Sequence, residues 1–250
     1  MLVLLRKTLP RAADIFSGIM TQNLAPGPTV PPEYIGVWKR SLLRTPQLED
    51  TTTQVYWMQT QSWHADIRVP AKRPTCADKS SLDQLTRDEL LGLAKQQGFC
   101  GTTQVDGDLC RWLRKYDYQP PNGTNDIGRI EFDTPDRLLE YGVEADYFEI
   151  WERLPGSGGA NSTLRLSAER FLFTAGSFFM IVRPRGHTLP SASDLVHLAS
   201  GAGDAAFRPI LDFEISFGHR AADTGQIVLS TLPWLQNSEI LLAENPSARG

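Results

Sequence analysis

Apolar and polar residues alternate along several short stretches of this chain, with the period of two that a half-buried β-strand requires. The alternation is most regular in residues 63–69 and 211–217, whereas residues 177–183 are almost continuously apolar, as in a strand buried on both faces. Asp106-Gly107 separates two further stretches and favours a hairpin turn, because both positions tolerate positive φ. Many short strands with turn signals between them predict a sandwich or a barrel, and we favour the barrel because closure removes exposed strand edges.

Few segments have the pattern of a helix. Thr86 and Glu89 have the spacing of a capping box, and Gly98 can end the helix, so we predict a helix over residues 86–97 that covers one end of the barrel. A second short helix is predicted within residues 190–202. The expected fold class is therefore all-β: an antiparallel, mostly up-and-down closed barrel with one or two short helices.

The chain divides into three parts by composition. Residues 1–33 contain several prolines near their end and no pattern that would form a core, so we expect a disordered leader and linker. Met20 is an alternative to Met1 as the true start of the protein. We expect a single barrel domain over residues 34–243 and a flexible tail over residues 244–250.

Gly36-Val37-Trp38 opens the first predicted strand, within the segment from Tyr34 to Arg40. This segment resembles the first-strand motif of the lipocalin and calycin superfamily. The pattern over residues 34–218 is similar to that of uncharacterised bacterial and fungal lipocalin-like proteins. The resemblance implies that Gly36 permits a bend and that Trp38 closes the base of the barrel beneath an arginine, for which Arg220 is one candidate. The chain carries elements beyond a lipocalin and has no counterpart of the familiar lipocalin disulfide.

The composition indicates which binding partners and which cellular compartment to expect. The net charge of -4 and the pI of about 5.6 argue against binding to nucleic acid, which requires a basic face. No apolar stretch is long enough to suggest a membrane-spanning helix. Three cysteines are too few for a disulfide framework, so we expect free thiols in a cytoplasmic protein, with a Cys100–Cys110 pair across a hairpin as the alternative. Nothing in the sequence indicates an oligomeric state.

Alternate side chains of a barrel strand face the interior. Two strands are rich in aromatic residues on one face, each with one charged side chain, and such a wall suits a small amphipathic or anionic ligand. The alternative is that these side chains only fill the interior, with Arg114 paired to Glu149. The candidate ligand-binding residues are Trp112, Arg114, Tyr116, Tyr147, Glu149 and Trp151.

A second polar group lies on one strand: His64, Asp66 and Arg68. A histidine beside an acid can act as a general base near neutral pH, but we favour a solvated outer face here, opposite the apolar residues of the same strand. We predict no metal site and no cofactor, because the chain has no nucleotide-binding motif and its other histidines are scattered. These are His187, His197 and His219.

We therefore expect a lipocalin-like protein that binds a small hydrophobic or amphipathic molecule non-covalently in its barrel. One alternative is a calycin-like lyase or isomerase, in which Arg114 holds an anionic group, Glu149 transfers a proton and Tyr116 donates a hydrogen bond. Another is a protein-interaction module, which requires a large exposed apolar patch. The sequence does not identify the ligand.

Overall fold

The computed structural model describes residues 22–23, 27–76 and 78–242. The alternative starts at Met1 and Met20, most of the predicted leader and the predicted tail lie outside the described residues. Within them, no helix has the length and apolar character needed to cross a membrane.

Eight antiparallel strands form a closed barrel, which confirms the predicted fold class. Strands that follow one another along the chain are paired, and the barrel closes where β10 pairs with β2, with Arg153 opposite Trp38. The short strand β3 (Glu49–Asp50) pairs with the end of β2. The barrel strands are β2 (Gly36–Arg44), β4 (Gln54–Gln59), β5 (Trp63–Val69), β6 (Gln97–Asp106), β7 (Leu109–Asp117), β8 (Ile127–Thr134), β9 (Arg137–Gly142) and β10 (Phe148–Arg153).

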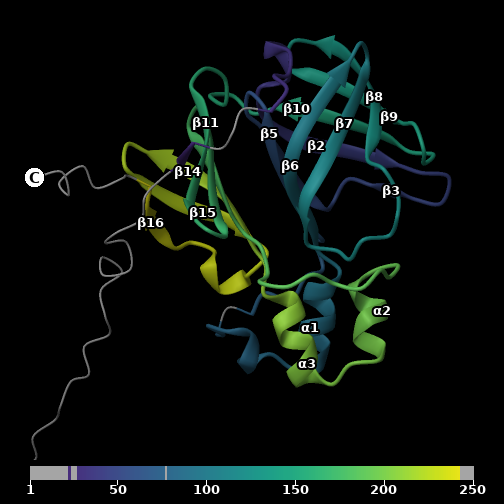
Figure 1. Ribbon diagram of the computed structural model, residues 1–250, viewed down its shortest axis with the longest axis vertical. Helices are drawn as coiled ribbons and strands as arrows, with labels where there is room; N and C mark the ends of the chain where they lie inside the picture. Colours follow the sequence, from purple (N-terminus) through teal and green to yellow (C-terminus); the bar gives the residue numbers. More distant parts are fainter. Residues whose placement is uncertain (1–21, 24–26, 77, 243–250) are drawn as a thin grey trace, which may run out of the picture.

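A second antiparallel sheet lies beside the barrel, and all its strands except β1 follow the barrel in sequence (Figure 1). Its strands are β1 (Gln22–Asn23), β11 (Asn161–Ser167), β12 (Arg170–Ala175), β13 (Phe178–Arg183), β14 (Glu214–Ala221), β15 (Thr224–Ser230) and β16 (Glu239–Leu241). The barrel itself is thus complete at Arg153. A single domain over residues 34–243 stays a prediction, although one hydrophobic cluster joins the two sheets.

Three short α-helices lie together at one end of the molecule: α1 (Arg87–Ala94), α2 (Leu195–Ser200) and α3 (Asp204–Leu211). The capping box of α1 is present as predicted, with Thr86 accepting from the Glu89 amide and Glu89 accepting from the Thr86 amide. This helix ends before Gly98, which belongs to β6. The strand predicted over residues 211–217 begins only at Glu214, because Leu211 is the last residue of α3 and Asp212 is its C-cap. Short 3-10 turns occupy Pro32–Tyr34, Leu82–Gln84 and Pro233–Leu235.

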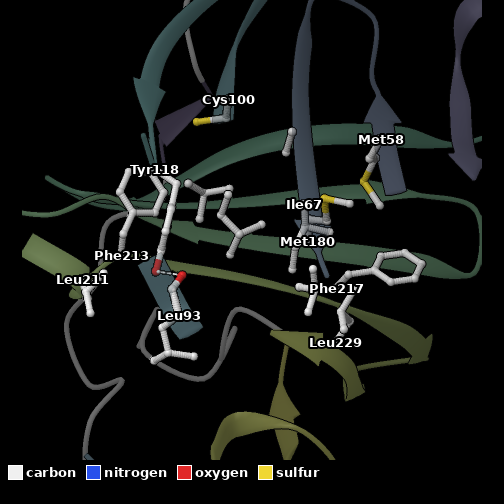
Figure 2. Close-up of a cluster of buried hydrophobic side chains, with 14 of the residues drawn as sticks. Met58, Ile67, Leu93, Cys100, Tyr118, Met180, Leu211, Phe213, Phe217 and Leu229 are labelled. Carbon is white, nitrogen blue, oxygen red and sulfur yellow. Dashed lines mark hydrogen bonds between the residues drawn. The ribbon is translucent and has the colours of Figure 1, made fainter. Parts of the chain in front are cut away.

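The main hydrophobic core lies between the outer face of the barrel, the second sheet and the helices, and we call it the inter-sheet cluster (Figure 2). Tyr118 links it to α1, because its hydroxyl donates to the Leu93 carbonyl at 3.1 Å. Members from each part are Ile67, Cys100, Met180, Phe217, Leu93 and Leu211.

Strand β5 is buried on both faces. Its apolar residues, such as Ile67, belong to the inter-sheet cluster, whereas its polar residues turn into the barrel. His64 and Asp66 are almost fully buried, and Arg68 is half-buried. The expectation of a solvated outer face was therefore wrong: a second sheet covers the outside of this strand, so its polar side is the inside of the barrel.

The segment before the barrel packs against it. Val30 is buried, and its amide donates to the Gln61 carbonyl at 2.9 Å. Residues 27–33 are thus part of the folded structure, in contrast to the expected linker.

The three cysteines are free and buried, as expected from their number. Cys100 lies in the inter-sheet cluster and Cys110 inside the barrel, so the alternative pair across the hairpin would join opposite faces of the wall.

Candidate functional site

Trp38 lies inside the barrel near the start of the first strand, and the role at the barrel base that the first-strand motif implies stays a prediction. Its side chain is fully buried, and its indole N–H donates to the Tyr34 carbonyl at 2.8 Å. The guanidinium above the indole ring belongs to Arg153, at 4.3 Å from the ring centroid, and not to Arg220. Arg153 is brought there because the last barrel strand pairs with the first.

Arg153 also ties together the chain segments beside Trp38. Its guanidinium donates to the carbonyls of Ile35, Glu33 and Pro135 and pairs with Asp136. Carbonyl oxygens at the ends of elements need such donors when they lack backbone partners. Arg153 and Trp38 thus join the segment before β2 to the ends of β8 and β10.

Tryptophan side chains fill the middle of the barrel. The ring of Trp57 meets those of Trp112 and Trp151 edge to face, with centroids 5.4 Å and 5.9 Å away. The indole N–H of Trp57 is buried and has no hydrogen-bond partner within the described part of the chain. A buried donor without an acceptor costs free energy, so its persistence calls for a water or a ligand atom.

Glu140 is the buried acid of this region. It accepts hydrogen bonds from the Tyr147 hydroxyl at 2.7 Å and from the Trp151 indole N–H at 3.0 Å. No cationic side chain of the described residues lies within 4.0 Å of its carboxyl group. Burial, followed by the charge of Glu149, raises the pKa of Glu140 well above its usual value.

Ion pairs occupy the other end of the barrel, which we call the charged end. Arg40 donates to Glu149 at 2.7 Å, and Arg68 donates to Asp66 at 2.8 Å. Burial raises the pKa of Glu149 and of Asp66, and the neighbouring guanidinium groups oppose that shift. The side chains of the charged end are Arg40, Asp50, Asp66, Arg68, Arg114, Asp117, Asp126 and Glu149.

Arg114 lies at the mouth of the charged end. It contacts Asp126 at 2.6 Å and Asp117 at 2.9 Å, and its guanidinium carbon is 3.7 Å from the centroid of the Phe99 ring. Its side chain is 36 % exposed. Arg114 therefore pairs with aspartates, and the pairing with Glu149 considered from the sequence was wrong.

Tyr116 does not face the barrel interior. A β-bulge interrupts the pairing of β6 with β7, so that Gly101 lies opposite Arg114 but Cys100 lies opposite Tyr116. A Cβ on Gly101 would lie 1.9 Å from the Leu113 carbonyl oxygen, and glycine permits this close approach. The extra residue reverses the alternation, and Tyr116 packs against Phe171 of the second sheet. Arg114, Glu149 and Tyr116 are thus not assembled around one proton-transfer site.

A small cavity lies between the tryptophans and the charged end. About 10 Å³ of it is wide enough for a water molecule. It combines four aromatic rings with three carboxyl groups and one guanidinium. The lining residues are Trp57, Asp66, Arg68, Phe99, Trp112, Asp126, Glu140 and Trp151.

Some of the six residues predicted to bind a ligand lie at this cavity. Trp112 and Trp151 line it, Arg114 stands at its mouth, and Tyr147 contacts Glu140. Glu149 is held among the ion pairs next to it. Sequence reasoning singled out Asp66 and Arg68 but assigned them to solvent, and it missed the other four lining residues: Trp57, Phe99, Asp126 and Glu140.

His64 lies deeper in the barrel and is neutral. Thr103 donates to Gln59, so the Thr103 hydroxyl accepts from Nδ1 of His64 at 3.0 Å. Burial, with a smaller effect of Arg114, lowers the pKa of His64 to about 3. No group of three or more potential ligands among the described residues is arranged to hold a metal ion.

A wider hollow of about 430 Å³ lies on the second sheet. Its described lining is short and polar, without an aromatic ring, and includes Ser162, Thr174 and Arg220. Two of its hydroxyl groups, those of Ser162 and Thr174, already bond each other at 2.8 Å. We therefore place the candidate site at the barrel, where apolar and polar groups converge.

Comparisons with known proteins support the architecture and not an activity. No protein-family model matches this sequence, and no curated protein matches it with significance. The structure is similar to the crystal structure of the uncharacterized protein YLR301w from Saccharomyces cerevisiae, with a TM-score of 0.52 and 11% sequence identity. The similarity covers 78% of this chain and 84% of the yeast chain. At this identity, the likeness shows a common fold alone.

Proposed function

We propose that the barrel binds a small amphipathic molecule non-covalently at the charged end of its interior. The observation that carries this proposal is a cavity in which tryptophan rings meet several ionisable side chains, with the unpartnered N–H of Trp57 among them. Ligand sites combine apolar walls with a few placed polar groups, and this lining has that composition.

Binding requires the mouth of the barrel to open, because the cavity holds no more than a water molecule as it stands. The movable group is Arg114, whose side chain is partly exposed and whose partners Asp117 and Asp126 also reach solvent. Ion pairs of this exposure contribute about 0.2–1 kcal/mol. A ligand can therefore displace Arg114 at low cost and take up its contacts with Phe99 and Asp126.

The lipocalin-like assignment belongs to the same proposal. The motif Gly36-Val37-Trp38 begins the first barrel strand, and an arginine of the last barrel strand, Arg153, covers Trp38. Both features agree with the resemblance seen in the sequence. The three free thiols support a cytoplasmic location, where reduced cysteines are the rule.

Tryptophan fluorescence tests the proposal, because three of the lining side chains are tryptophans. The purified full chain is titrated with fatty acids, porphyrins, aromatic acids and aromatic amines, and thermal shifts are recorded in parallel. We expect one class to quench the emission and raise the Tm.

Two variants locate the response. Trp112 and Trp63 are both 7% exposed, but Trp112 lines the cavity and Trp63 lies in the inter-sheet cluster. Trp112→Phe should remove much of the quenching, and Trp63→Phe should retain it. The proposal fails if no class gives a response, or if quenching depends on Trp63 alone.

A further inference from the structure

The charged end of the barrel has an excess of acidic groups. Each of its three arginines lies against two carboxyl groups: Arg40 contacts Glu149 and Asp50, Arg68 contacts Asp66 and approaches Glu149 at 4.0 Å, and Arg114 contacts Asp126 and Asp117. Glu140 adds one more carboxyl group, with no cationic side chain within 4.0 Å among the described residues, and burial keeps its proton on until a further positive charge comes close. The region therefore has capacity for additional positive charge.

Arg114 shows how a cation is held at the mouth. Its guanidinium lies over the face of Phe99, and one of its nitrogens donates to a carboxylate oxygen of Asp126. A cation over an aromatic face and beside a carboxylate is attracted by the ring quadrupole and by the negative charge together. Phe99 and Asp126 both also line the cavity, so the same two groups can serve a ligand.

The deeper part of the cavity suits the remainder of such a ligand. Trp112 and Trp151 offer apolar surface, and the free N–H of Trp57 can donate to an oxygen atom of the ligand or to a bridging water. Glu140 lies beside these rings, 3.0 Å from the Trp151 nitrogen. Glu140 and Asp126 line the same small cavity, so an ammonium group beside Asp126 would also stabilise the ionised form of Glu140.

We propose that the ligand of the barrel is a small organic cation, an amine or ammonium compound with an apolar body, and that Arg114 occupies the position of its charged group in the free protein. This inference rests on the proposed function, and it names the ligand class that the proposed site prefers.

The test uses three probes that share one ring and differ in charge: 2-phenylethylamine, phenylacetate and 2-phenylethanol. Each is titrated into the full chain by calorimetry near neutral pH. We expect the amine to bind about tenfold or more tightly than the other two, since one favourable charge contact in a partly buried site contributes about that factor.

A matched pair of variants tests the role of Glu140. Glu140→Gln on β9 should weaken amine binding about tenfold, whereas Glu152→Gln, at an exposed position of the neighbouring strand β10, should leave it unchanged. Arg114→Ala should strengthen amine binding, because it removes the internal competitor.

Each outcome decides between the proposals. If phenylacetate or the alcohol binds as tightly as the amine, the cation preference is overturned while binding in the barrel stands. Equal effects of the two glutamine variants, or weaker amine binding in Arg114→Ala, also overturn it. If none of the three probes binds, the inference is overturned, and the wider ligand panel decides the proposed function separately.

Discussion

The two faces of strand β5 border interiors of opposite chemistry. On one face, Ile67 and its apolar neighbours join the inter-sheet cluster, which is built almost entirely from aliphatic and aromatic side chains. On the other face, Asp66 and Arg68 enter a barrel interior where carboxyl and guanidinium groups are packed against tryptophans. Both interiors exclude most water, but the barrel interior also contains charged side chains, which the inter-sheet cluster lacks.

The contrast indicates which interior holds the fold and which carries the function. Apolar burial stabilises the native state, whereas buried ion pairs seldom repay the cost of removing their charges from water. The inter-sheet cluster, as the largest apolar cluster, is thus expected to contribute most to stability. The barrel interior also holds an apolar cluster, and an unpartnered indole N–H occurs in both interiors, at Trp57 and at Trp63. What distinguishes the barrel is the set of ionisable side chains packed against its tryptophans, which favours a site there.

The largest loss of stability should come from a substitution in the inter-sheet cluster. Phe173→Ala removes a fully buried ring from the inter-sheet cluster and should lower the free energy of unfolding by about 3–5 kcal/mol. Urea unfolding measures this change, and the ligand response of any protein that remains folded should persist. A loss below about 1 kcal/mol would mean that this cluster does not hold the two sheets together.

The next largest loss of stability should come from a substitution beside Trp38. Arg153→Ala removes the guanidinium over Trp38 and its donors to backbone carbonyls, and should cost about 2 kcal/mol. Arg220→Ala is the control on the second sheet and should change the unfolding free energy by less than about 0.5 kcal/mol. Equal losses in the two variants would contradict the assignment of Arg153 as the residue that joins these segments.

Glu140→Gln tests the burial of an acid without a cationic partner. Because burial raises the pKa of Glu140, the unfolded chain loses this proton above about pH 4.5 while the folded protein keeps it. Wild-type stability then falls as the pH rises, by about 1.4 kcal/mol per unit, until the folded group also ionises. Glutamine has no proton to lose. Above about pH 5, the free energy of unfolding of the variant should therefore rise relative to that of the wild type by up to about 1.4 kcal/mol per pH unit. If the difference in unfolding free energy between the two proteins does not vary with pH, Glu140 is ionised in the folded protein.

The smallest effect is expected at the mouth. Arg114→Ala removes a partly exposed side chain and should cost no more than about 1 kcal/mol, as measured by thermal unfolding. A loss of several kcal/mol would identify Arg114 as a structural residue and would argue against its displacement by a ligand.

Much of the fold could be predicted from local patterns. Alternation predicted strands of the barrel, Thr86 and Glu89 predicted the start of α1, and Gly36 and Trp38 predicted the first strand. Each of these depends on residues close together in sequence, whose physical preferences act locally.

The errors have long-range causes. The bulge at Gly101 depends on a close approach to β7, and it reverses the side of Tyr116. The polar face of β5 was assigned to solvent because nothing in that strand reveals that a second sheet covers its other face. Arg153 reaches Trp38 only because β10 closes the barrel, and Glu140 gains its significance only when Trp151 and Tyr147 surround it.

The most direct test of the barrel site is the indole N–H region of an ¹H–¹⁵N spectrum, in which each of the six tryptophans gives one signal. With a ligand from the panel or with 2-phenylethylamine, the account predicts the largest shifts for Trp57, Trp112 and Trp151, assigned through single phenylalanine variants. Signals of Trp63 and Trp234, which pack in the inter-sheet cluster, should move little. Shifts confined to those two residues would contradict binding inside the barrel.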